Sequence, residues 1–117
     1  MTDNAAVLRQ AIDDWNAGDL VGYMELYDPS VTLHGVPPGI DAVRSMYAGM
    51  WRAFPGSHLS LDDVITEGEK LACRYTWQGS NAKGGETVVM PGVTIMHFRN
   101  GKRVERWDFE GTEQNIA

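Results

Sequence analysis

The sequence predicts an α+β domain in which three N-terminal helices pack on one face of a bent antiparallel sheet. Apolar residues recur at helical spacing in three segments before residue 55, and four strand-like runs follow between residues 58 and 110. The turn Asn100-Gly101 joins the last two runs and predicts a β-hairpin of type I′. With 117 residues, 43% of them hydrophobic, the chain suits a single domain over residues 1–117.

The three helices are expected over residues 5–17, from Asp19 to Pro29, and from Asp41 to Pro55. Aspartate is a favoured N-cap, and proline ends a helix because it cannot continue the hydrogen-bond ladder. The third helix has the clearest apolar stripe, which consists of Val43, Met46, Tyr47, Met50, Trp51 and Phe54. Core packing is the usual explanation of such a stripe. Methionine and aromatic side chains also suit the wall of an apolar ligand pocket.

The strands are expected to begin with a short run at residues 31–34, before the turn-rich segment that leads into the third helix. The four later runs cover residues 58–66, 70–79, 86–99 and 102–110. Pro91-Gly92 inside the third of these runs indicates a bulge or a bend, since proline cannot donate to the ladder.

The composition argues against several classes of partner and cofactor. The net charge is −6 and there is no run of Lys or Arg, so neither nucleic acid nor an anionic membrane is expected as a partner. The single Cys73 fits a reducing compartment, and neither a signal peptide nor a transmembrane run is recognisable, so a cytoplasmic protein is expected. His34, His58 and His97 lack a neighbouring ligand at metal spacing, so we expect no metal and no cofactor.

Asp108 is the most informative candidate for chemistry. It lies in a predicted strand between Trp107 and Phe109, although aspartate is a poor strand former. A carboxylate held beside large apolar groups tends to have a raised pKa and can transfer protons. The alternative is that Asp108 points to water. Strict alternation places Val104, Arg106, Asp108 and Glu110 on one face of this strand, and Arg103, Glu105, Trp107 and Phe109 on the other.

Four segments of the chain are informative together and in this order: Trp15-Asn16-Ala17-Gly18-Asp19-Leu20, Leu26-Tyr27-Asp28-Pro29-Ser30-Val31-Thr32-Leu33-His34-Gly35, Phe54-Pro55 and Gly101-Lys102-Arg103-Val104-Glu105-Arg106-Trp107-Asp108. In these segments the chain resembles the SnoaL-like polyketide cyclases of the nuclear transport factor 2-like superfamily. The resemblance implies a cone-shaped, strongly curved antiparallel sheet that wraps a hydrophobic cavity closed by three helices. It also implies cofactor-free general acid/base chemistry, an intramolecular aldol closure, with an aspartate of the last strand that matches Asp108.

At two positions the chain departs from related proteins, which narrows the chemistry that the resemblance implies. A histidine that the cyclases carry on the strand before the last hairpin turn corresponds to Thr94 here. The ketosteroid isomerases of the superfamily need a tyrosine and an aspartic acid where this chain has Ala11 and Thr94, which argues against their chemistry. His34 matches a polar site where those isomerases hold their base.

The sequence therefore predicts a cofactor-independent enzyme of cyclase or isomerase type that acts on a hydrophobic, carbonyl-bearing small molecule. Asp108 and His34 are the expected catalytic pair. The expected substrate-binding residues are Trp15, Tyr47, Met50, Trp51, Met96 and Thr94. A non-catalytic small-molecule-binding module, and a hydrolase or dehydratase of the same fold, remain alternatives. Trp77 and Trp107 on an open sheet face suggest a homodimer.

Overall fold

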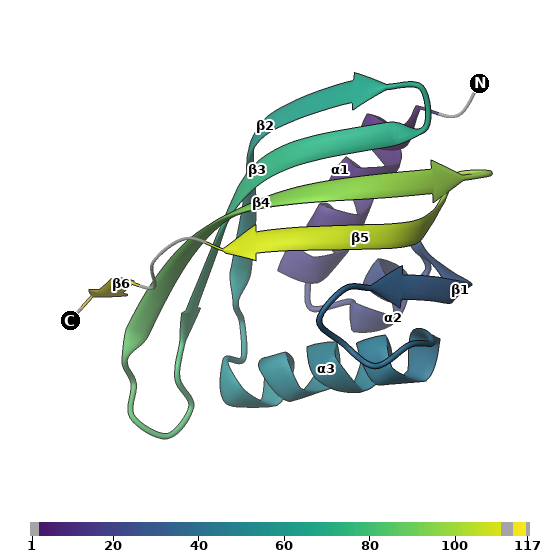
Figure 1. The fold of residues 1–117 in the computed structure, drawn as a ribbon. Coiled ribbons are helices and arrows are strands. Elements are labelled where there is room, and N and C mark those ends of the chain that lie inside the picture. The colour runs from purple at the N-terminus through teal and green to yellow at the C-terminus, as the bar shows by residue number, and fades with distance from the viewer. Residues whose placement is uncertain (1–2, 111–113, 117) are drawn as a thin grey trace.

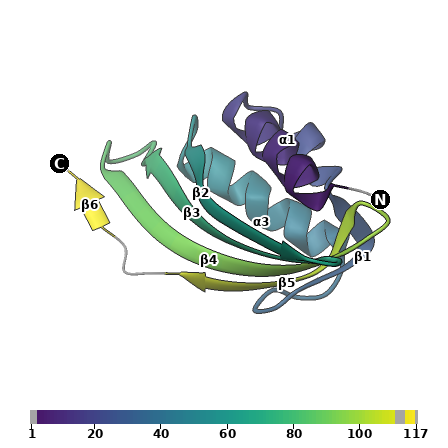
Figure 2. The same ribbon diagram turned by 90° about the horizontal axis from the view of Figure 1, so that it is seen from above.

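The computed structural model describes residues 3–110 and 114–116, and consists of a curved sheet with helices along its concave side (Figures 1 and 2). The elements in chain order are α1 (Asn4–Asn16), α2 (Leu20–Met24), β1 (Tyr27–Leu33), α3 (Ile40–Ala53), β2 (His58–Glu67), β3 (Lys70–Ser80), β4 (Thr87–Arg99), β5 (Lys102–Glu110) and β6 (Gln114–Ile116). The predicted α+β class is confirmed.

The sheet has the order β1-β5-β4-β3-β2, and β6 pairs with the far end of β4. Neighbours are antiparallel except β1 and β5, which run parallel. The hairpin turn between β4 and β5 has positive φ at both Asn100 and Gly101, as a type I′ turn requires. The four long strands lie within one or two residues of their predicted bounds.

The first helix begins where the sequence indicates, because the Asp3 side chain accepts a hydrogen bond from the backbone N–H of Ala6. The predicted extent of the second helix is wrong. Asp19 caps it, but α2 ends at Met24, and Tyr27 lies on β1. The apolar residues keep a helical spacing as far as Tyr27 by coincidence, but the backbone of this segment pairs with β5.

The third helix, α3, also differs at its start. Gly39 occupies the N-cap position and its φ of 103° places it in the left-handed region that favours glycine. Asp41 lies in the first turn, where its carboxylate accepts from Arg44 at 2.9 Å. The helix ends before Pro55, as predicted, and its buried positions Val43 and Tyr47 face the sheet.

Pro91 does not create a bulge between β3 and β4. The register of these strands runs without a shift from Lys70↔His97 to Ser80↔Thr87. Pro91 instead lies between two pairings of β4, with β6 up to Val89 and with β5 from Gly92 onward. A residue without an N–H fits this position, where the strand changes partner on its other edge.

One bulge determines which side chains of β5 face inward. His97 pairs with Glu105, but the next residue of β4, Phe98, pairs with Arg103, so Val104 is the additional residue. Alternation therefore restarts at Val104, and Arg103 shares the concave face with Arg106 and Asp108. The predicted assignment of Arg103 to the opposite face is wrong, because it assumed an unbroken strand.

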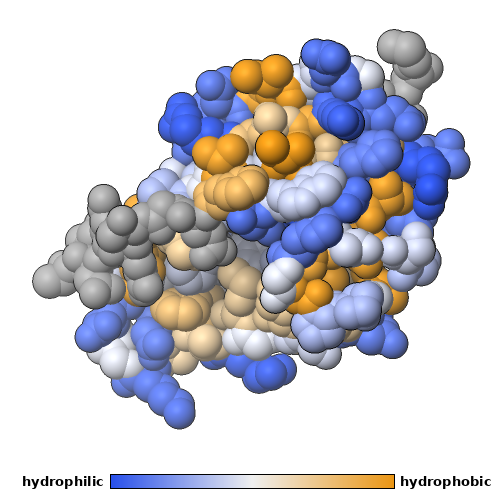
Figure 3. All heavy atoms as spheres, in the orientation of Figure 1, coloured by the Kyte–Doolittle hydropathy of each residue, from blue (hydrophilic) through white to orange (hydrophobic). Residues whose placement is uncertain are grey.

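The outer face of the sheet carries hydrophobic side chains among hydrophilic ones (Figure 3). Its exposed large apolar residues include Val93, Ile95 and Phe109. Trp77 is not among them, since it is 5% exposed and lies on the concave side. The homodimer stays a prediction. Within the described residues, no helix is long and apolar enough to cross a membrane.

Candidate active site

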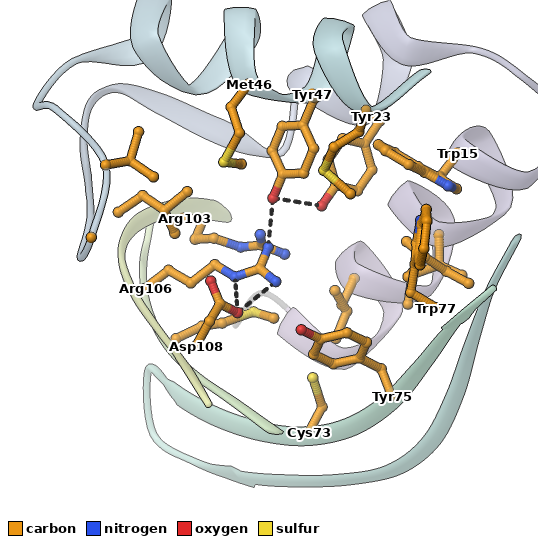
Figure 4. A pocket seen from close by; sticks show the side chains of 18 of the residues that line it. Trp15, Tyr23, Met46, Tyr47, Cys73, Tyr75, Trp77, Arg103, Arg106 and Asp108 are labelled. Carbon is orange, nitrogen blue, oxygen red and sulfur yellow. Dashed lines mark hydrogen bonds and ion pairs between the residues drawn. The ribbon is translucent and has the colours of Figure 1, made fainter. Parts of the chain in front are cut away.

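A pocket of about 350 Å³ lies between the concave face of the sheet and the helices (Figure 4). Its wall is mostly aromatic and sulfur-containing, and includes Trp15, Tyr23, Met46, Tyr47, Met50, Cys73, Tyr75, Trp77, Met90 and Met96. The arginine and aspartate side chains of the wall all come from β5: Arg103, Arg106 and Asp108. An apolar pocket with a few converging polar groups is the usual form of a small-molecule site.

Asp108 is held in the pocket wall by one of its two oxygens. Oδ1 accepts from the Thr94 hydroxyl at 2.6 Å and from Arg106 Nε at 2.7 Å, and it forms an ion pair with Arg106 Nη2 at 2.7 Å. Among the described residues, no hydrogen bond reaches Oδ2. The side chain is 22% exposed, so the carboxylate is fixed in orientation while Oδ2 stays open to a ligand.

Arg106 connects Asp108 to a cluster of tyrosines on the opposite side of its guanidinium (Figure 4). Nη1 donates to the hydroxyls of Tyr27 at 2.9 Å and Tyr47 at 2.8 Å, while Nη2 lies 3.4 Å from the Thr94 hydroxyl. The Tyr27 and Tyr47 hydroxyls are 2.7 Å apart, and Tyr23 donates to Tyr47 at 3.3 Å. All three guanidinium nitrogens of Arg106 therefore donate hydrogen bonds within the site.

Arg103 lies behind this cluster and is fully buried. Its Nη1 donates to the Tyr27 hydroxyl, and its guanidinium carbon lies 4.5 Å from the centre of the Tyr27 ring. Its Nε has no hydrogen-bond partner among the described residues, and no carboxylate of that part of the chain forms an ion pair with it.

The two guanidiniums shift the ionisation of the tyrosine cluster. Burial raises the pKa of Tyr23, but the positive charges of Arg106 and Arg103, together with hydrogen bonds within the tyrosine cluster, outweigh burial and lower this pKa to about 8. Burial raises the pKa of Tyr27 to about 12, and that of Tyr47 well above its usual value. The first proton to leave the cluster therefore comes from Tyr23, and its phenolate then opposes further ionisation.

Of the predicted ligand contacts, Trp15, Tyr47, Met50 and Met96 line the pocket. Trp51 and Thr94 do not. Trp51 packs behind Trp15, with ring centres 5.3 Å apart, and Thr94 is fully buried beneath Asp108. The Thr94 hydroxyl orients the carboxylate instead of contacting a ligand. The thiol of Cys73, the other small polar group of this wall, has its pKa raised by burial.

His34 lies at the rim of the pocket, and the structure does not bring its ring to Asp108. Nε2 is 2.8 Å from the carboxylate of Glu105, and the ring stacks on Trp107 at 4.8 Å between centres. Glu105 and Trp107 alternate with Arg106 and Asp108 along β5, so they point to the opposite face of the sheet. His34 and Asp108 line the same pocket, as expected, but His34 lies at the rim and makes no hydrogen bond to Asp108 among the described residues. Its catalytic role stays a prediction.

The tyrosine cluster and Arg103 were missed by reasoning from the sequence. Arg106 carried a signal, since alternation alone places it on the face of Asp108. Tyr23 lies within the second predicted helix and Tyr47 is an expected ligand contact, but no local pattern shows that their hydroxyls meet. Among the described residues, no group of three His, Cys, Asp or Glu side chains is arranged to hold a metal ion. The expectation of cofactor-free chemistry stays a prediction.

The fold agrees with comparisons to known proteins. The family model of the SnoaL-like domain matches residues 8–106, most of the chain. The chain belongs to the SnoaL-like family. Among curated proteins, no sequence matches this SnoaL-like chain.

Solved structures share the fold at low sequence identity. AclR from Streptomyces galilaeus, a candidate hydroxylase, is 22% identical with a TM-score of 0.84, over 93% of this chain and 89% of its own. IdmH from Streptomyces antibioticus, a candidate polyketide cyclase, is 20% identical with a TM-score of 0.80, over 93% of this chain and 92% of its own. TerC, crystallised with polyporic acid, is 17% identical with a TM-score of 0.76, over 92% of this chain and 91% of its own.

Proposed function

We propose that this SnoaL-like protein is a cofactor-independent acid/base enzyme that acts on a hydrophobic small molecule with a carbonyl group. A polyketide cyclase that closes a ring by an intramolecular aldol reaction, or a related isomerase, fits the site best. The observation that carries the proposal is the state of Asp108, with Oδ1 held by two hydrogen bonds and an ion pair and Oδ2 open to the pocket. The likeness to IdmH and TerC supports the choice of an organic ligand.

The reaction begins with proton transfer to Oδ2 of Asp108 from the carbon next to the carbonyl. The electron pair of the broken C–H bond moves into an enolate, whose negative charge develops in the same pocket as Arg103 and Arg106. In the cyclase, the enolate carbon attacks a second carbonyl of the same molecule and forms the new C–C bond. The resulting alkoxide then takes the proton back from Asp108, so atoms and charge balance without a co-reactant.

His34 is given no proton-transfer step in this proposal, because its ring contacts Glu105 and Trp107. Arg106, instead of His34, is the polar partner of Asp108 in this proposal. The guanidinium holds Asp108 on one edge and the tyrosine hydroxyls on the other, which places a fixed positive charge between base and oxyanion.

The experiment is α-proton exchange into a simple enolisable ketone, 2-tetralone, followed by NMR in D₂O. Wild-type protein should accelerate deuterium incorporation, and Asp108→Asn should remove about 10²–10⁴-fold of the acceleration. Asp63→Asn, on the exposed part of β2, is the matched control and should change nothing. Undiminished exchange in Asp108→Asn contradicts the proposal. Binding of 2-tetralone without any exchange supports the alternative of a non-catalytic binding module.

A further inference from the structure

The buried charges of the pocket do not balance. Arg103 and Arg106 are 0% and 9% exposed, and Asp108 is the acidic group that pairs with Arg106. Among the described residues, Arg103 has no carboxylate partner, and its Nε donates to nothing. Its contact with the Tyr27 ring offsets only part of the cost of burying a cation. With its tyrosines neutral, the site has an excess of one positive charge.

The hydroxyl cluster next to these cations has one hydrogen more than it can use. Tyr27 accepts from both guanidiniums, so its own hydrogen goes to Tyr47. Tyr47 then accepts from Tyr27 and from Arg106, and shares one further contact with Tyr23. Whichever of Tyr23 and Tyr47 donates in that contact, the other keeps a hydrogen without an acceptor among the described residues. Both side chains line the pocket, whereas Tyr27 does not.

We propose that the ligand of this pocket enters with an anionic oxygen, as a carboxylate, an enolate or a phenolate. The oxygen accepts the spare hydrogen of the Tyr23–Tyr47 pair and compensates the charge of Arg103. This inference deepens the proposed function, because it names the substrate class of the same site. It also separates the two polar ends of the pocket, since the anion binds beside the tyrosines and the proton leaves toward Asp108 across Arg106 (Figure 4).

At high pH, the ionised Tyr23 side chain can supply the negative charge that the ligand supplies at neutral pH. Tyr23, with its pKa near 8, becomes a phenolate that neutralises the excess charge. The titratable and charged groups that face it come from β1, α3 and β5: Tyr27, Tyr47, Arg103 and Arg106. Anion affinity is therefore expected to fall as the pH rises through about 8.

The test compares two ligands of the same shape and different charge, naphthalene-2-carboxylate and 2-naphthamide, by isothermal titration calorimetry at neutral pH. The carboxylate should bind about tenfold more tightly, which is the difference between a charge-assisted and a neutral hydrogen bond. Titration with 4-nitrophenol, whose absorbance reports its ionisation, distinguishes the phenolate class from the carboxylate class. Equal or tighter binding of the amide would overturn the inference.

Variants make the result specific to the pocket. Arg103→Met should reduce the preference for the carboxylate, while Arg44→Met, which removes an exposed arginine of α3, should keep it. Asp108→Asn removes the pocket's carboxylate and should tighten carboxylate binding, although it should abolish α-proton exchange. The two proposals can therefore fail separately. Weaker carboxylate binding by Asp108→Asn contradicts the charge argument, and if Arg103→Met does not fold, the wild-type comparison of the two ligands still decides.

Discussion

Tyr23→Phe should change how the stability of this protein depends on pH. The Tyr23 hydroxyl lies in the buried cluster with Tyr47, and the positive charges of Arg106 and Arg103 lower its pKa to about 8. In the unfolded chain the same hydroxyl ionises near 10. Phenylalanine keeps the ring contacts with Trp15 and Tyr47 but has no proton to lose.

The sign follows from which state releases the proton first. Between pH 8 and 10 the folded protein has lost the Tyr23 proton while the unfolded chain still holds it, so the free energy of unfolding rises with pH. Two pKa units correspond to about 3 kcal/mol. Below pH 8 the variant lacks only its hydrogen bond to Tyr47, which is worth about 1 kcal/mol and does not depend on pH.

Urea unfolding followed by tryptophan fluorescence measures the effect. The difference in unfolding free energy between wild type and Tyr23→Phe should be constant at neutral pH and then grow by as much as about 3 kcal/mol up to pH 10. Tyr27→Phe is the control of opposite sign. Burial raises the pKa of Tyr27 to about 12, so its contribution is lost only as the pH rises above 10. A difference that stays flat from neutral pH to 10 would refute the role assigned to the guanidiniums.

Two further substitutions test the support of the site. Thr94→Val keeps the buried shape but removes one of the donors to Asp108 Oδ1, and it should lower α-proton exchange by roughly 10- to 100-fold while the circular dichroism spectrum is unchanged. Retained exchange would show that Arg106 alone fixes the carboxylate. Gly92→Ala should destabilise the fold by about 1–3 kcal/mol, because the new Cβ would lie 2.5 Å from the Tyr75 ring, whereas Gly84→Ala has open space and serves as its control. Equal thermal stability of the two glycine variants would contradict this packing argument.

The local parts of the fold were predictable from the sequence. Strand alternation and turn residues located β2 to β5 and the hairpin turn, because both signals involve neighbours in the chain. The extent of α2 was not predictable in this way. Tyr27 has helical spacing, but its hydroxyl binds Arg103, a partner 76 residues away, and the backbone of its segment pairs with β5. Long-range pairing outweighed a weak local preference.

The candidate site was predictable in Asp108 and in part of its apolar wall, but not in most of its polar groups. Asp108 stood out because a carboxylate between aromatic residues of a strand is unusual. His34 was expected to face the cavity and does line the pocket, but its contacts with Glu105 and Trp107 of the neighbouring strand could not be read from the sequence. Arg103 could not be assigned to the concave face from the sequence, because a bulge interrupts the alternation of side chains along β5. The extra residue of this bulge is visible only in the register of β4 with β5.

Because Val104 is an extra residue in β5, the net charge of the pocket depends on the number of residues in this strand. Shortening β5 by this one residue would turn the Arg103 side chain toward solvent and leave the pocket electrically neutral, with every remaining pocket residue of that strand unchanged. A scaffold of this kind can thus alter the charge it prefers in a guest molecule by a single insertion or deletion near a hairpin, without any exchange of side chains. Comparisons of related domains by aligned identity alone would overlook that difference.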